Sequence, residues 1–139
     1  MKSLHLVPGL VTALLLSGTA FAAPETPRPD QAVAISGIET VCTGGSANAR
    51  AEPRWKDYST RVEFAATNGD YLGGENVTIK GNGKTIAVRC AGPWLLMDLP
   101  KGSYDLHASL PGWRVNALTF HAPGHVVVDF KRLGAGENA

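Results

Sequence analysis

The chain carries almost no net charge. Its 139 residues include 13 Lys and Arg against 12 Asp and Glu, a formal net charge of +1 at pH 7. A protein that binds nucleic acid needs clustered positive charge to neutralise phosphates, and a protein held electrostatically on a membrane needs a basic patch. The sequence therefore argues against both kinds of partner.

Long hydrophobic runs are equally scarce, and the one present lies near the N-terminus. Residues 6–16 are mostly apolar, but this segment is too short to cross a bilayer as a resident helix. Lys2 precedes it, and the tripeptide AFA at residues 20–22 follows as an A-x-A cleavage site. These features predict a signal peptide over residues 1–22, whose removal leaves 12 Lys and Arg against 12 Asp and Glu. We expect a periplasmic or secreted product with no further membrane span.

Cysteine is rare as well. The chain has 2 cysteines, Cys42 and Cys90, and both lie in the part expected to be exported. Neither has a histidine or a second cysteine two or three residues away, as zinc sites usually require. In an oxidising compartment two such cysteines most often pair, so we predict a disulfide between them.

Motifs of catalysis are missing from the sequence. It contains no Gly-x-Ser-x-Gly elbow, no phosphate-binding loop and no His-Glu-x-x-His metal motif. The acidic residues Glu63, Asp70, Glu75 and Asp98 are scattered, so they do not indicate the carboxylate pair of a glycosidase. We therefore expect no catalytic site and no cofactor, and an envelope hydrolase is the least favoured function.

What the chain does have, from Thr60 onward, is a succession of short runs in which apolar and polar residues alternate. Turn residues such as Asn82-Gly83 separate these runs roughly every 8–12 residues. Helices do not alternate with the strands, which excludes a parallel α/β sheet. The pattern predicts a mainly β fold, an antiparallel β-sandwich of about seven strands.

The domain boundaries follow from composition. Residues 23–37 are rich in proline and predict a flexible leader, residues 38–133 a single sandwich domain, and residues 134–139 a disordered tail. Ile35, Ile38 and Val41 indicate at most a short edge strand.

A short helical segment is expected before the first regular strand. Ser46 is suited to cap a helix over residues 47–50, and Pro53 is suited to begin a second turn through Trp55 and Tyr58. Because proline lacks a backbone N–H, Pro53 excludes one continuous helix unless it is kinked.

The strand region also resembles a known family. The elements that carry the resemblance are Asp70-Tyr71-Leu72, Asn76-Val77-Thr78-Ile79-Lys80, Gly92-Pro93-Trp94-Leu95-Leu96 and Leu99-Pro100-Lys101-Gly102-Ser103-Tyr104. This order, ending in L-P-x-G-x-Y, resembles carboxypeptidase regulatory-like domains, and more narrowly the small exported type found in Gram-negative bacteria. The resemblance implies a transthyretin-like (prealbumin-like) Greek-key sandwich with a non-catalytic accessory or binding role.

Three histidines are candidate metal ligands. His121 and His125 flank a Pro-Gly turn, and His107 lies on the polar side of its strand. Imidazole suits copper and zinc, but the spacing of these residues matches no zinc motif. The alternative is that all three are solvated residues at strand ends.

Aromatic residues suggest a second kind of site, because exposed Trp and Tyr suit sugar binding. Trp94 and Trp113 stand at expected strand starts, which favours a place in the core. Trp55 and Tyr58 are candidate ligand-binding residues in the helical segment, where Trp55 is also suited to cover an open end of the sandwich.

The sequence thus predicts an exported, non-catalytic binding module. We expect it to bind a protein or a cell-envelope component through loops or an exposed sheet edge. The alternative is a periplasmic protein that binds copper or zinc, a carbohydrate or another small ligand. No nucleic-acid partner is expected, and the sequence leaves the oligomeric state open.

Overall fold

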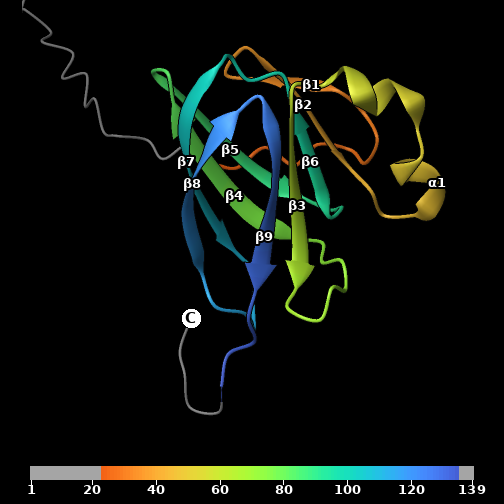
Figure 1. Cartoon of the computed structure of the whole chain (residues 1–139), viewed down its shortest axis with the longest axis vertical. Helices are drawn as coiled ribbons and strands as arrows, with labels where there is room; N and C mark the ends of the chain where they lie inside the picture. The colour runs from red at the N-terminus through yellow and green to blue at the C-terminus, as the bar shows by residue number, and fades with distance from the viewer. Residues whose placement is uncertain (1–22, 135–139) are drawn as a thin grey trace, which may run out of the picture.

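The computed structural model describes residues 23–134, which contain nine strands and two short helices (Figure 1). The predicted signal peptide lies outside this range, as do residues 135–139 of the predicted tail. The strands are β1 (Val33–Ile35), β2 (Ile38–Thr43), β3 (Thr60–Ala66), β4 (Glu75–Gly81), β5 (Lys84–Cys90), β6 (Trp94–Met97), β7 (Gly102–Ser109), β8 (Asn116–Ala122) and β9 (Gly124–Phe130), and the helices are α1 (Ala47–Arg50) and the 3₁₀ helix η1 (Pro53–Asp57).

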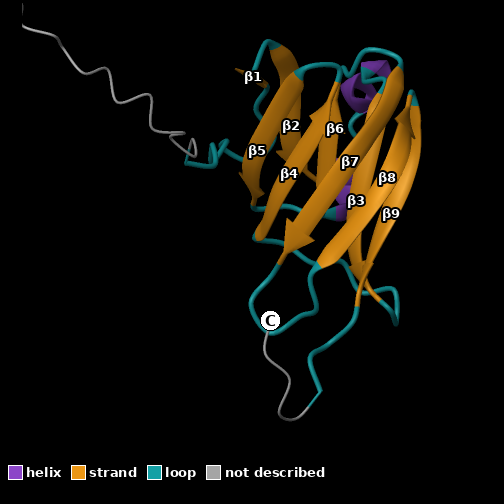
Figure 2. Cartoon of the chain, turned by 90° about the vertical axis from the view of Figure 1, so that its left-hand side faces the viewer, coloured by secondary structure: helices purple, strands orange, loops and turns teal. Residues whose placement is uncertain are grey.

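The strands form two sheets packed face to face, which confirms the predicted sandwich. One sheet has five strands in the order β1-β2-β6-β3-β9, and the other has four in the order β5-β4-β7-β8. Figure 2 shows the four-stranded sheet in front of the five-stranded one. All pairs are antiparallel except β3 and β9, which run parallel.

The core lies between the sheets and is built by the period-two alternation of the strands. On β7, for example, Tyr104, Leu106 and Ala108 are buried, whereas the residues between them are exposed. The Tyr104 hydroxyl donates to the Pro100 carbonyl at 2.6 Å and accepts from Asn82 Nδ2 at 2.8 Å. The L-P-x-G-x-Y element is therefore held by its own tyrosine, which ties the turn before β7 to the turn between β4 and β5.

The local turn and helix predictions are confirmed. Asn82 and Gly83 have φ angles of 49° and 69°, the left-handed values that a tight hairpin turn between β4 and β5 requires. The Ser46 side chain accepts a hydrogen bond from the Ala49 N–H, and Pro53 begins η1. None of the helices in residues 23–134 has the length and apolar composition needed to cross a membrane.

Strands β3 to β9 correspond to the seven expected, and β1 and β2 are additional. The edge strand expected around Val41 is the interior strand β2, with Glu39 as its one exposed residue. Because Trp55 of η1 covers the outer face of β2 at Val41, both faces of this strand are buried and its sequence shows no alternation. The strand expected to begin at Trp113 begins at Asn116, since Trp113 makes an isolated bridge with Arg132.

The predicted disulfide between Cys42 and Cys90 is present. It joins β2 of one sheet to β5 of the other, with a Cα–Cα distance of 5.4 Å and a sequence separation of 48. Both cysteines are completely buried. The bond is therefore a covalent link across the core.

We expect replacement of both cysteines, by Cys42→Ala and Cys90→Ala, to lower the free energy of unfolding by about 4 kcal/mol, because the open chain gains the entropy of the lost loop. Urea denaturation followed by tryptophan fluorescence measures this difference. A double variant as stable as the parent would contradict the structural role of the bond.

Candidate binding face

An open groove of about 1180 Å³ lies over the outer face of the four-stranded sheet. We call this feature the sheet groove. Its floor is made by alternate residues of all four strands, namely Thr78 and Lys80 of β4, Thr85 and Ala87 of β5, Asp105 and His107 of β7, and Ala117 and Thr119 of β8. The floor exists because the neighbouring residues on each strand point into the core.

Small side chains give the sheet groove its depth. Alanine and threonine make up five of the eight floor residues named above, so little rises above the pleated backbone. None of the residues that line the groove is aromatic. The floor carries one lysine, one histidine and one aspartate, and Asp105 accepts a hydrogen bond from the Thr119 hydroxyl at 2.9 Å.

Two segments from the N-terminal part of the chain wall the sheet groove along the β5 edge. The leader contributes Ala23 and Glu25, and the turn between β1 and β2 contributes Ser36. The Ser36 hydroxyl donates to the Thr85 carbonyl at 2.6 Å, and Lys84 Nζ donates to the Ser36 carbonyl at 3.1 Å. The predicted leader, residues 23–37, therefore lies against the sheet rather than apart from it.

The structure does not bring the three candidate metal-ligating histidines together. His107 lies on the groove floor, whereas His121 lies opposite Ser103, four residues along β7, or about 13 Å away. His125 is on β9 of the other sheet and faces the opposite side of the molecule. Among residues 23–134 no cluster of three or more His, Cys, Asp or Glu side chains is arranged to hold a metal.

His125 instead belongs to a charged cluster on the outer face of the five-stranded sheet. Its Nε2 lies 3.0 Å from Glu63 Oε1, and Arg61 Nε lies 3.2 Å from the same oxygen. The Arg61 guanidinium covers the ring of Trp94, 4.4 Å from its centroid. Trp94 is thus buried as predicted, but on the outside of the sheet and not in the core between the sheets.

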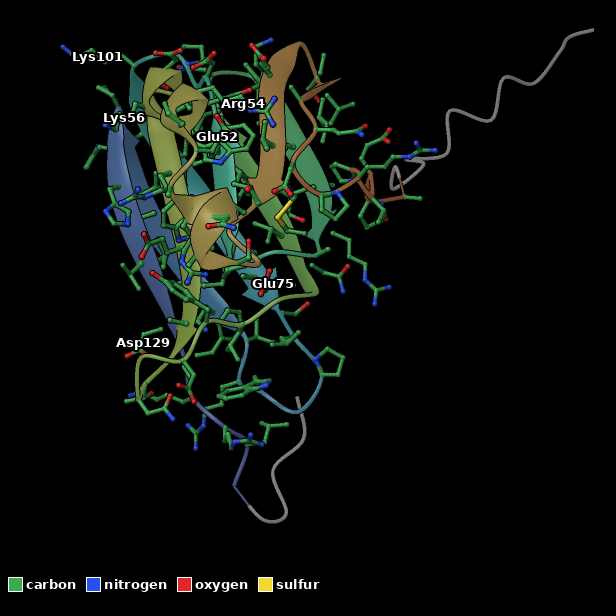
Figure 3. All side chains as sticks on the ribbon, turned by 90° about the vertical axis from the view of Figure 1, so that its right-hand side faces the viewer. Glu52, Arg54, Lys56, Glu75, Lys101 and Asp129 are labelled. Carbon is green, nitrogen blue, oxygen red and sulfur yellow. A yellow bond between two sulfur atoms is a disulfide. The ribbon has the colours of Figure 1, made fainter. Side chains whose placement is uncertain are left out.

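The two candidate ligand-binding aromatics, Trp55 and Tyr58, do not form an exposed platform. Trp55 is 7% exposed and packs on Val41 and Leu96, and its indole N–H donates to the Ala49 carbonyl at 2.7 Å. It covers the outer face of the five-stranded sheet, not an open end of the sandwich, and Figure 3 shows the helical segment in front of that sheet. Trp55 has no free ring face for a sugar, because Arg54 lies 4.3 Å above its ring on the solvent side of this packing.

Tyr58 lies beside Trp55, with the ring centroids 6.1 Å apart. Its hydroxyl donates to Glu39 Oε1 at 3.0 Å. Burial, followed by this hydrogen bond, raises the pKa of Tyr58 to about 12. The hydroxyl therefore stays protonated and serves to attach the helical segment to β2.

Glu75 is the one acidic side chain of residues 23–134 that is completely buried (Figure 3). It opens β4 on the inward face, directly opposite Cys90 in the ladder between β4 and β5. Neither carboxylate oxygen has a hydrogen-bond partner among the described residues. Because burial disfavours the charged form, the pKa of Glu75 rises to about 8.

Comparison with known proteins adds no assignment. No protein-family model and no curated protein sequence matches this chain. The carboxypeptidase regulatory-like resemblance therefore stays a prediction.

The buried Glu75 predicts an unusual pH dependence. Between about pH 4.5 and pH 8 the unfolded chain ionises this residue while the folded chain keeps its proton. The free energy of unfolding should fall through this window, by up to about 1.4 kcal/mol per pH unit, and level off above it. Glu75→Gln should remove this slope and stabilise the protein most at the alkaline end.

Urea denaturation of both proteins at several pH values measures the effect. Asp129→Asn, at an exposed position of β9, is the control and should leave the slope unchanged. Parallel pH profiles for the parent and Glu75→Gln would rule out a buried neutral carboxyl.

Proposed function

We propose that this chain is an exported, non-catalytic binding module of the carboxypeptidase regulatory-like type, which recognises a polypeptide partner in the cell envelope. The observation that carries the proposal is the sheet groove, an open channel of about 1180 Å³ beside a sheet edge. Such a channel suits an extended chain, which gains hydrogen bonds from the edge and side-chain contacts from the floor.

The composition of the sheet groove favours a polypeptide over the other ligands considered. Sugar-binding surfaces stack rings on aromatic side chains, and no aromatic residue lines this groove. A copper or zinc site needs several converging ligands, and His107 is the one histidine of the floor. Alanine and threonine floors instead leave room for the alternate side chains of an extended backbone.

The disulfide supports the exported location. Bonds of this kind form and persist in oxidising compartments, and the bond here is fully enclosed by the core. Together with the predicted signal peptide, this favours the periplasm of a Gram-negative cell.

The location is tested by producing the full chain in a Gram-negative host and measuring the intact mass of the product in the periplasm. We expect a chain that begins at Ala23 and carries no free thiol, because residues 1–22 are the predicted signal peptide. A variant with Ala20→Leu and Ala22→Leu, which spoils the A-x-A site, should accumulate unprocessed. Cytoplasmic accumulation of the full-length parent would refute export.

The binding role is tested by site-specific photo-crosslinking in the periplasm. A photo-crosslinking amino acid in place of Thr85 lies in the sheet groove, whereas one in place of Asp129 lies on the opposite face. We expect a discrete polypeptide adduct from the first position and none from the second.

A matched pair of bulky substitutions decides whether such an adduct is specific. Thr78→Trp fills the groove floor beside β5 and should reduce the adduct at position 85 by at least about tenfold. Val127→Trp adds similar bulk to the opposite face, where Val127 is 51% exposed, and should leave the adduct intact. An adduct that survives Thr78→Trp would contradict binding through the sheet groove.

A further inference from the structure

The outer edge of β5 already holds an extended segment. Glu25 of the leader bridges Val88 in parallel, with its N–H donating to the Ala87 carbonyl at 3.1 Å and its carbonyl accepting from the Arg89 N–H at 2.8 Å. The backbone groups of Ala87 and Arg89 that make these bonds point away from β4. The edge therefore pairs with an extended backbone in the structure, and the segment that occupies it is not a strand of the fold.

The leader is a poor occupant of this edge. In a parallel ladder every second residue of the added strand makes hydrogen bonds to the neighbouring strand. The next bonding position after Glu25 is therefore Pro27. Proline has no N–H to donate, and the bridge at Glu25 is isolated. Two backbone hydrogen bonds contribute only about 1–3 kcal/mol in total, which a longer strand exceeds easily.

The exposed start of the leader, residues 23–26, can leave this edge without disturbing the sandwich, because the rest of the leader is held separately. The Asp30 N–H donates to the Cys42 carbonyl at 2.8 Å, and Asp30 Oδ1 accepts from the Thr43 hydroxyl at 2.5 Å. Arg54 Nη2 donates to the Asp30 carbonyl at 3.0 Å. Pro27 is also buried, so release would be confined to residues 23–26.

We infer that the β5 edge is a strand-docking site which the leader covers in cis, and that an extended segment of a partner polypeptide displaces residues 23–26 and pairs in parallel with β5. This inference rests on the proposed function, since it names how the partner enters the sheet groove. Side chains on one face of the docked strand contact the floor at Thr85, Ala87 and Thr78, the residues nearest the edge.

The chemistry of the edge specifies the partner segment. Its pairing positions must be free of proline, because each must donate an N–H. Its floor-facing side chains must be compact and polar or small, to match alanine and threonine.

The first test weakens the pairing of the leader with β5. Glu25→Pro removes the N–H that bonds to Ala87, whereas Glu25→Ala keeps it and removes only the carboxylate. We expect Glu25→Pro to raise the adduct at position 85 by about two- to tenfold, the ratio that corresponds to one lost hydrogen bond. Glu25→Ala should not raise it. Because Glu25 is exposed and its bridge is isolated, neither change threatens folding.

The second test blocks the edge itself. Arg89→Pro removes the outward N–H that bonds to Glu25 without removing a bond to β4, and edge strands tolerate proline at such positions. Arg89→Ala keeps the N–H and is the matched control for the side chain. In the Glu25→Pro background, where the competing leader is already weakened, we expect the adduct to fall about two- to tenfold with Arg89→Pro and to fall less with Arg89→Ala, with cooperative urea unfolding as the check on folding.

The outcomes separate this inference from the proposed function. Opposite effects of Glu25→Pro and Arg89→Pro support strand docking. If both leave the adduct unchanged while Thr78→Trp abolishes it, a partner occupies the groove without pairing, and the inference is overturned although the function stands. If Thr78→Trp has no effect, the proposed function itself fails. Should Arg89→Pro not fold, Glu25→Pro decides alone, since an unchanged adduct there overturns displacement.

Discussion

The fold depends on one constraint: each sheet must bury one apolar face, and its other face must be either covered or polar. The inner faces bury each other, and the Cys42–Cys90 bond joins them. The outer faces of the two sheets differ in composition. The five-stranded sheet is apolar at Val41 and Leu96 and needs a cover, which Trp55 supplies from η1. The four-stranded sheet has small and polar outward residues, needs no cover, and remains open as the sheet groove.

This asymmetry explains where sequence reasoning succeeds. Strands with one buried and one exposed face have an alternating sequence, and β4, β5 and β7 were predictable for that reason. Strand β6 is buried throughout and was predictable from its apolar run instead. Strand β2 could not be predicted by alternation, because Trp55 covers its outer face and both faces are buried. The contacts of His125 with Glu63 and Arg61 were not predictable either, since parallel pairing of β3 with β9 joins residues 64 positions apart. The groove floor has no sequence signature, because alanine and threonine carry no distinctive chemistry.

The two outer faces also differ in how their polar groups are satisfied. On the five-stranded sheet Glu63, His125 and Arg61 contact one another and Arg61 covers Trp94, so the charges there are already occupied. In the sheet groove Lys80 and His107 stand among small residues on an open floor. A partner that approaches the first face must break existing contacts, whereas one that enters the second gains contacts at little cost. The open face is therefore the better binding surface on energetic grounds.

The β5 edge adds a conflict between folding and binding that the leader resolves. An exposed strand edge invites pairing with any extended chain, so soluble proteins cover or interrupt such edges. Ser36 and Glu25 cover this one, at Thr85 and at Ala87 and Arg89 respectively. A leader that paired along its whole length would close the edge permanently, and an absent leader would leave it open to indiscriminate association. Proline at position 27 limits the pairing to a single bridge, which is the strength that the proposed docking requires: enough to oppose weak competitors, and less than that of a longer, proline-free strand.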